Sequence, residues 1–242
     1  MSERHDHFWA EFFGIAAADL RVPGVSVVSH AELDGYRGVW FFRRGARLVV
    51  SAPTPWVDHI RGLLAQSADP TGLPDERALV HIFGSSLERW IGPAFQGALE
   101  ARELCGTTSD NVRVLTDGDS EAVAEFRDLC GVGDWEDSAI EKAQLMRYGY
   151  FDNARLVSIA GFRLWKTGAG DPCVVTLPKY RGRGLAKEVV RGVLAAAIAE
   201  EHVLLYQTLE ANVPAVRVAL GLGYSRYANH VAVRLATEEP SN

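Results

Sequence analysis

The sequence has 242 residues, of which 48% are hydrophobic and 23% are charged, and its formal net charge at pH 7 is −6. This composition is typical of a globular protein, and the length predicts one large or two small domains with enough chain to bury a core. The acidic balance argues against a general nucleic-acid-binding protein, whose binding domain is usually basic. No apolar run is long enough to span a bilayer and no charged-then-apolar leader opens the chain, so we expect no membrane partner and a cytoplasmic location.

The cysteines and histidines show no pattern of cross-links or metal ligands. Cys105, Cys130 and Cys173 are widely spaced and form no CxxC pair, which favours free or buried thiols in a reducing compartment over a disulfide framework. The histidines have no ligand spacing among them, so we expect no metal site.

The first hundred residues predict a smaller N-terminal α/β domain, residues 1–105. Apolar periodicity predicts helices over 6–20, 54–64 and about 75–84, with a loop at 67–76. Short runs rich in β-branched and aromatic residues predict strands at 25–30, 38–42 and 46–52. Residues 85–101 lead towards the second half, and the polar stretch 106–111 is the expected domain boundary.

The second domain, residues 106–242, alternates strands and helices. We expect strands at 112–115, 155–165, 173–177, 203–209 and 226–236, with 203–209 buried on both faces. We expect helices from Asp117 or Asp119 to Gly131, and over 136–149, 185–201 and 214–223.

The segment TLPKYRGRGLAKEVV, residues 176–190, predicts a strand that turns into a helix around an anion. Pro178 cannot donate to a strand ladder, and Gly182 and Gly184 remove side chains from the turn. The helix that follows adds unpaired N–H donors and the positive end of its dipole, which favours a phosphate or pyrophosphate. Five basic residues against one acidic residue, Glu188, give residues 178–191 a local excess of positive charge: Lys179, Arg181, Arg183, Lys187 and Arg191. The alternative is a plain glycine-containing connection with solvated basic side chains.

The run Arg181-Gly182-Arg183-Gly184-Leu185-Ala186 fits the (Gln/Arg)-x-x-Gly-x-(Gly/Ala) signature of the GNAT superfamily of acyl-CoA N-acyltransferases. Residues 212–224, NVPAVRVALGLGY, resemble a second segment of that family, and the order of elements from 112 to 236 is similar to its fold. The resemblance implies a mixed, mostly antiparallel central sheet flanked by helices. The N-terminal hundred residues resemble no family that we can name.

The resemblance also implies a site for acetyl-CoA. The backbone amides of Arg181, Gly182, Arg183, Gly184, Leu185 and Ala186 would hold the CoA pyrophosphate. The main chain of Val174, Val175 and Thr176 would bind the pantetheine arm, which inserts where two parallel strands separate. Asn212 would contact the same arm or position the thioester, although an asparagine before Val213-Pro214 is equally consistent with helix capping.

Amine acetylation needs a group that takes a proton from the amine. Asp171 and Glu210 are the candidate bases, with a turn-forming role for Asp171 and a capping role for Glu210 as alternatives. The tyrosine that often protonates the leaving thiolate in this family is replaced here by Ala219, and neither Tyr224 nor Tyr227 would occupy its place.

The sequence therefore predicts an N-acetyltransferase that moves an acetyl group from acetyl-CoA directly to a primary amine. The acceptor is a small molecule or a peptide, and a homodimer is compatible with the sequence. Two alternatives remain: a non-catalytic module that binds acyl-CoA as a sensor, and a structural αβ unit without a CoA site.

Overall fold

The computed structural model describes residues 3–30, 36–143, 145–165 and 168–236. Contacts divide the chain into two compact units that are not contiguous in sequence. Unit 1 comprises Met1–Gln96, Gln207–Val213 and Arg226–Asn242, and unit 2 comprises Gly97–Tyr206 and Pro214–Ser225. The sequence places one boundary at 105/106. The chain instead passes between the units several times, and the strand expected at 226–236 belongs to unit 1.

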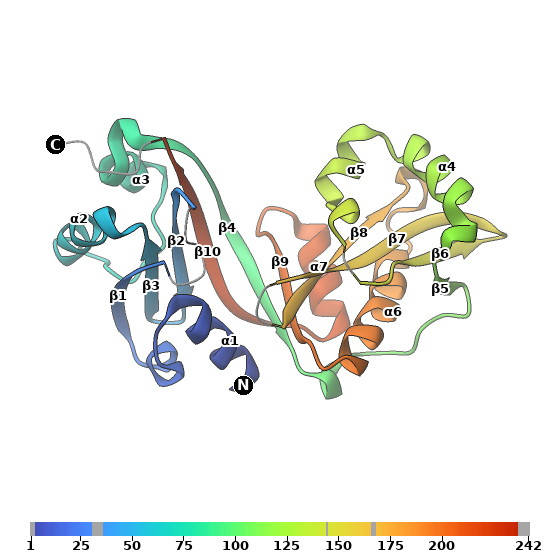
Figure 1. The fold of residues 1–242 in the computed structure, drawn as a ribbon, viewed down its shortest axis with the longest axis horizontal. Coiled ribbons are helices and arrows are strands. Elements are labelled where there is room, and N and C mark those ends of the chain that lie inside the picture. Colours follow the sequence, from blue (N-terminus) through green and yellow to red (C-terminus); the bar gives the residue numbers. More distant parts are fainter. Residues whose placement is uncertain (1–2, 31–35, 144, 166–167, 237–242) are drawn as a thin grey trace. The chain divides into compact units, whose positions relative to one another are not determined.

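Unit 1 contains five strands in the order β1-β3-β2-β10-β4 (Figure 1). Their bounds are β1 (Gly24–Ser29), β2 (Gly38–Arg44), β3 (Arg47–Ala52), β4 (Leu87–Leu99) and β10 (Ser225–Leu235). β1 pairs with β3 in parallel, whereas β2 pairs with both β3 and β10 in antiparallel fashion. The last strand of the chain thus completes the N-terminal sheet through long-range pairing.

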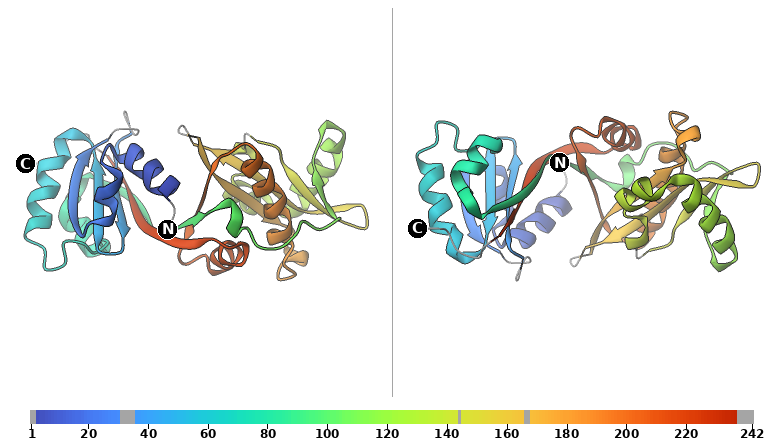
Figure 2. Two further views of the ribbon diagram at one scale, coloured as in Figure 1. Left: turned by 90° about the horizontal axis from the view of Figure 1, so that it is seen from below. Right: turned by 90° about the horizontal axis from the view of Figure 1, so that it is seen from above.

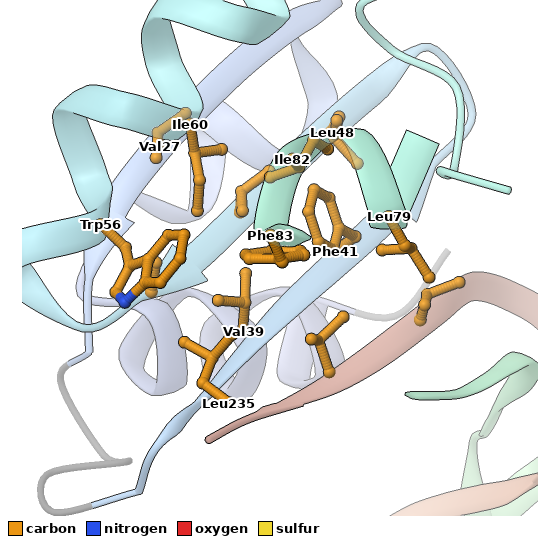
Figure 3. Packing of buried hydrophobic residues seen from close by; sticks show 14 residues of the cluster. Val27, Val39, Phe41, Leu48, Trp56, Ile60, Leu79, Ile82, Phe83 and Leu235 are labelled. Carbon is orange, nitrogen blue, oxygen red and sulfur yellow. The ribbon is translucent and has the colours of Figure 1, made fainter. Parts of the chain in front are cut away.

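One face of this sheet packs against α2 (Thr54–Ala65) and α3 (Glu76–Phe83). Figure 3 shows Trp56 and Ile60 of α2 and Phe83 of α3 against Val39 and Phe41 of β2. These side chains are 3% exposed or less. Alternate residues of a strand point to opposite faces, so Trp40 and Phe42 of the same strand face away from this core.

The opposite face of the unit 1 sheet is covered by α1 (Glu3–Phe13), as Figure 2 shows. Trp9 lies 4.6 Å from Phe42 between ring centroids, and Phe12 lies 5.4 Å from Trp40. The helix predicted over 6–20 is shorter, because Gly14 adopts a φ of +66° and the chain re-forms as a separate 3-10 helix, Ala17–Arg21.

A buried carboxylate attaches α1 to the sheet. Asp6 is fully buried, lies 2.6 Å from Arg21 Nε and 2.5 Å from Arg44 NH1, and accepts a 2.7 Å hydrogen bond from the Tyr227 hydroxyl. Burial alone would raise the pKa of Asp6, but the hydrogen bonds from Tyr227 and Arg21 and the charge of Arg44 lower it below its ordinary value.

Unit 2 holds five strands in the order β9-β8-β7-β6-β5. Their bounds are β5 (Val112–Val114), β6 (Tyr148–Asp152), β7 (Arg155–Leu164), β8 (Ala169–Thr176) and β9 (Val203–Leu209), the last residues of β9 being counted in unit 1. β5 to β8 are consecutively antiparallel, and β8 pairs with β9 in parallel. The expected fold class, a mixed and mostly antiparallel sheet flanked by helices, is confirmed.

Helices cover both faces of the unit 2 sheet (Figure 1). α4 (Ser120–Cys130) and α5 (Val132–Ser138) pack on β7 and β8, where Phe126 and Trp135 join Ile159 in a buried cluster. α6 (Leu185–Ala199) contacts β5, β6, β7 and β8 through a buried apolar stripe. A short helix, α7 (Val213–Leu222), precedes β10.

Two segments differ from the expectation. Residues 136–149 do not form one helix: α5 ends at Ser138, a 3-10 turn spans Ile140–Lys142, and β6 begins at Tyr148. Gln144, within the expected helix, lies outside the described residues. The long strand β4 occupies part of 85–101, where the sequence indicated no element. Gly92, Pro93 and Gly97 weaken the strand pattern of that segment.

Replacing Asp6 with Asn should lower the free energy of unfolding by about 3–5 kcal/mol, because it leaves the buried Arg44 guanidinium without its counter-charge. Urea denaturation followed by circular dichroism measures this loss. Arg21→Met is the matched control: the Arg21 side chain is 52% exposed, so we expect a cost of about 1 kcal/mol or less. Equal and small losses for both variants would contradict a stabilising role for the buried carboxylate.

Candidate functional site

The loop between β8 and α6 contains the glycine-rich motif. β8 ends at Thr176, Pro178–Tyr180 forms a 3-10 turn, and α6 begins at Leu185. Gly182 and Gly184 have φ values of +78° and +83°, which residues with a Cβ rarely adopt. A Cβ on either glycine would meet no protein atom within 4 Å. The positive φ of both glycines, and not crowding by the protein, therefore explains why the loop uses glycine.

Five consecutive backbone N–H groups in this loop, those of residues 182–186, have no hydrogen-bond acceptor within the described part of the chain. On either side of them, the Arg181 amide donates to the Pro178 carbonyl at 3.3 Å and the Lys187 amide to the Gly184 carbonyl at 3.0 Å. The N-terminus of α6 adds the positive end of a helix dipole. The arrangement supplies donors suited to an anion without requiring a side chain.

Some of the basic side chains of the motif have structural partners. Arg181 donates to the Thr176 carbonyl at 3.0 Å and to Asp134 at 2.6 Å. Arg191 is 7% exposed and donates to the Cys105 and Thr107 carbonyls and to Glu188. Arg191 therefore attaches α6 to the segment that precedes β5, and it adds no free positive charge to the loop. Three cations of the motif form no ion pair with a described residue: Lys179, Arg183 and Lys187.

β8 and β9 pair over a very short stretch. Only Ala169 and Gly170 of β8 pair with β9, opposite Val203 and Leu204, whereas β8 pairs with β7 as far as Thr176. Residues 171–176 of β8 therefore have no strand partner on the β9 side within the described chain. Val174, Val175 and Thr176, the residues expected to bind a pantetheine arm, all lie on this stretch.

Asp171 lies inside β8 and not in a turn. It is 3% exposed, and its carboxylate accepts hydrogen bonds from Arg163 at 2.7 and 3.2 Å and from the Trp165 indole at 2.8 Å. Burial raises the pKa of Asp171, although Arg163 and Trp165 oppose that rise. The turn-forming alternative is wrong, because Asp171 is paired with Arg163 across the β7–β8 hairpin.

Glu210 and Asn212 belong to unit 1, whereas Asp171 and the β8–α6 loop belong to unit 2. Glu210 Oε1 lies 2.5 Å from Arg226 NH1 and 2.5 Å from Asn229 Nδ2, so its carboxylate connects the end of β9 to β10. Asn212 directly precedes α7, and its amide donates to the Leu209 carbonyl at 2.9 Å. The position of Asn212 suits the capping alternative.

Ala219, at the position of the family's usual tyrosine, is fully buried in α7. The neighbouring tyrosines have other partners: Tyr224 donates to the Leu205 carbonyl at 3.1 Å, and Tyr227 donates to Asp6. Burial raises the pKa of both hydroxyls, with the Asp6 hydrogen bond raising that of Tyr227 further. Neither tyrosine replaces the missing one.

The sequence did not indicate a buried contact between a histidine and a glutamine in unit 1. His230 is 5% exposed, and its Nδ1 lies 2.6 Å from Nε2 of the buried Gln96. Its ring stacks on that of Trp40, with 4.8 Å between the ring centroids and 7° between the ring planes. Gln96 Oε1 has no partner within the described residues. Burial lowers the pKa of His230 to about 4, so the imidazole is neutral at neutral pH. Gln96 and His230 are 134 residues apart, and no local motif signals their contact.

The remaining expectations concern cysteines, metals and membranes. Cys105, Cys130 and Cys173 are all free thiols, and burial raises the pKa of Cys173 to about 11. Among the described residues, no group of three or more His, Cys, Asp or Glu side chains is placed to hold a metal ion. None of the described helices has the length and apolar character needed to cross a membrane.

Comparison with known proteins identifies the family of the region that contains the loop. Residues 116–224 match the acetyltransferase (GNAT) family, so this part of the chain is a domain of that family. The match includes the β8–α6 loop, Asp171 and α7, and does not extend to the first hundred residues. No curated protein sequence matches the chain.

Several solved structures are similar to this chain. A GCN5-related N-acetyltransferase from Kribbella flavida is 17% identical over 76% of this chain and 75% of its own, with a TM-score of 0.51. A protein described as a putative GNAT-family acetyltransferase from Novosphingobium aromaticivorans is 22% identical over 78% of this chain and 84% of its own, with a TM-score of 0.49. A GNAT-family acetyltransferase from Colwellia psychrerythraea is 16% identical over 62% of this chain, with a TM-score of 0.48. The match spans only 58% of the length of that protein.

Because His230 is buried in its neutral state, the free energy of unfolding should depend on pH. Its folded pKa of about 4 lies below the ordinary 6.5, so its contribution to stability is complete above pH 6.5 and is lost as the pH falls towards 4. We expect a loss of about 3 kcal/mol across that window, and a smaller loss in His230→Phe. Urea denaturation at several pH values measures both. An imidazole resonance that titrates near pH 6.5 in the folded protein would contradict the assignment.

Proposed function

We propose that this chain is an N-acetyltransferase that uses acetyl-CoA to acetylate a primary amine on a small molecule or a peptide. The observation that carries the proposal is the run of unpaired amides over residues 182–186 at the start of α6. The family match over 116–224 supports it, because the loop lies within the matched region.

In this proposal the loop amides, from Arg181 or Gly182 to Ala186, donate to the CoA pyrophosphate. Lys179, Arg183 and Lys187 supply nearby positive charge that no described carboxylate neutralises. The pantetheine arm would lie along Val174, Val175 and Thr176, where β8 has no partner strand on the β9 side. The thioester supplies an activated acyl group, and the protein positions it and accepts the proton of the amine.

Asp171 is the better of the two candidate bases. Burial raises its pKa towards the range in which a carboxylate takes protons effectively, and it lies on β8 three residues before Val174. Glu210 is held by Arg226 and Asn229 at the end of β9. A role for Asn212 in contacting the arm stays a prediction.

A second function, a non-catalytic sensor of acyl-CoA, is favoured by one observation. The position of the family's usual proton donor, a tyrosine, is occupied here by Ala219, which is fully buried in α7. A sensor would use the same amide run but would need no base. The two functions differ in turnover: an enzyme releases CoA faster when offered its amine, whereas a sensor only binds.

Gly184→Val should weaken the affinity for CoA at least tenfold, because the new side chain would project into the open space beside the amides. The φ of +83° at residue 184 is also unfavourable for a residue with a Cβ. Calorimetric titration with acetyl-CoA measures the effect, and dephospho-CoA, which keeps the pyrophosphate, should show the same loss. Gly45→Val is the control, because Gly45 has a φ of +58° and an equally open Cβ position in the β2–β3 turn of unit 1. Unchanged affinity in a folded Gly184→Val protein would refute the loop assignment.

Asp171→Asn should lower kcat by about 100-fold or more while CoA affinity changes little, because it removes the base and leaves the loop intact. Arg163→Lys is the matched control: it removes the two-point contact of the guanidinium but keeps a cation beside the carboxylate, so turnover should persist. Steady-state kinetics across a panel of amines measures both variants. Equal losses would show that the ion pair, and not proton transfer, matters. Glu210→Gln with Arg226→Met then tests the other candidate in the same way.

A further inference from the structure

Strand β1 forms an open edge of the unit 1 sheet. It is the terminal strand of the order β1-β3-β2-β10-β4, and within the described chain it pairs with β3 alone, in parallel (Figure 1). The amides of Gly24 and His30 donate towards β3, to the Ala46 and Ala52 carbonyls. Since the backbone groups of successive residues point to opposite sides of a strand, residues 25, 27 and 29 direct their N–H and C=O groups away from β3.

The outward backbone groups of β1 are available for pairing. The amides of Val25, Val27 and Ser29 have no acceptor within the described part of the chain. The Val27 carbonyl accepts a single long contact, from Arg61 NH2 at 3.3 Å. Charged side chains and prolines commonly protect a strand edge from pairing, and Gly24–Ser29 contains neither. The outer edge of β1 is therefore suited to an added strand.

A groove runs along this edge, between β1 and α2. Its volume is about 400 Å³, and it is lined by residues 25–28 of β1, by Arg61, Leu64 and Ala65 of α2, and by Pro70. Val25 and Val27 point to the α2 side of the sheet, where they pack in the same apolar cluster as Leu64. Directly opposed residues of paired strands point to the same face. Side chains of an added strand that lie opposite Val25 and Val27 would therefore enter the groove.

Arg61 determines which charge the groove favours. Its side chain is 57% exposed, and its ion-pair partner Asp58 is 91% exposed, so this pair contributes little to stability. The contact of Arg61 with the Val27 carbonyl is long, and an amide of an added strand would replace it. A carboxylate on that strand would then engage the released guanidinium, because arginine–carboxylate hydrogen bonds are stronger than neutral ones.

The same charge disfavours a second copy of this chain as the added strand. Gly24–Ser29 is uncharged, so a β1 edge from another copy would bring no carboxylate to Arg61 from its own strand. Antiparallel pairing of two β1 edges around a two-fold axis near Val27 would also bring Arg61 of both copies towards that axis, since each contacts Val27. The complementary occupant is an acidic segment of another polypeptide.

We propose that the outer edge of β1 binds an extended acidic peptide as an added antiparallel strand. Main-chain hydrogen bonds to Val25 and Val27 would supply the affinity, and two side chains would supply the specificity. The residue opposite Val27 is acidic and meets Arg61. The residue two positions further along the peptide, opposite Val25, is aliphatic and contacts Leu64. This surface lies in unit 1, outside the family match over 116–224, and is independent of the proposed acetyl transfer.

The test uses the capped peptide acetyl-Thr-Lys-Glu-Thr-Val-Thr-Lys-amide with the full chain. Calorimetry should show saturable binding, and hydrogen exchange followed by NMR should show that the peptide slows exchange of the Val25 and Val27 amides. N-methylation of the peptide valine removes an N–H that points to β1, and should weaken binding at least tenfold. N-methylation of the threonine between the glutamate and the valine is the matched control, because that N–H points away from β1, and it should change the affinity less than threefold.

Arg61→Gln should weaken binding of this peptide at least fivefold, and should not change the weaker binding of a peptide with glutamine in place of glutamate. The variant should fold, because the Arg61 side chain is mostly exposed. Arg43→Gln is the control of equal charge change: Arg43 is exposed, donates to the Gly45 carbonyl, and should leave binding unchanged. Absence of binding, equal affinity of the two N-methylated peptides, unchanged affinity in Arg61→Gln, or a dimer of this chain that protects the Val25 and Val27 amides would each overturn the proposal.

Discussion

The loop between β8 and α6 depends on two glycines with positive φ, Gly182 and Gly184. They leave five consecutive backbone N–H groups at the start of a helix without an acceptor among the described residues. The loop is nevertheless fixed, because Arg181 connects it to Thr176 and Asp134 without using those amides. Its donors are therefore preorganised, and the proposed binding of an anion would require little ordering of the chain.

Buried charge organises the two units in a similar way. Asp6 attaches α1 to the unit 1 sheet through two arginines, and Arg163 stabilises Asp171 across the β7–β8 hairpin. Each carboxylate has enough donors to remain charged in a largely apolar setting. The same reasoning removes Arg191 from the anion site, since its contacts with Glu188 and two carbonyls satisfy it.

The sequence was sufficient to predict the β8–α6 turn, α6 and most strands, because glycine, proline and the spacing of apolar residues act over a few residues. It was insufficient where distant residues decide the outcome. β10 completes the sheet of unit 1 by pairing with β2, and nothing within 226–236 specifies that partner. Gly170-Asp171-Pro172 looks like a turn by composition, yet Asp171 lies in a strand because Arg163 faces it. The contact of His230 with Gln96 likewise depends on the folded sheet.

The missing tyrosine at Ala219 weighs less against catalysis than its absence first suggests. A thiolate leaving group is stable enough near neutral pH that a proton donor accelerates its departure without being essential, whereas a protonated amine cannot attack at all. If the chain acetylates an amine as proposed, the demanding step is therefore deprotonation of the amine. Asp171 has a pKa raised by burial and lies on the strand proposed to bind the pantetheine arm, so it would supply a group for that step. The ion pair with Arg163 stabilises the β7–β8 hairpin in an enzyme and in a sensor alike, so turnover with an amine, and not the presence of Asp171, distinguishes the two.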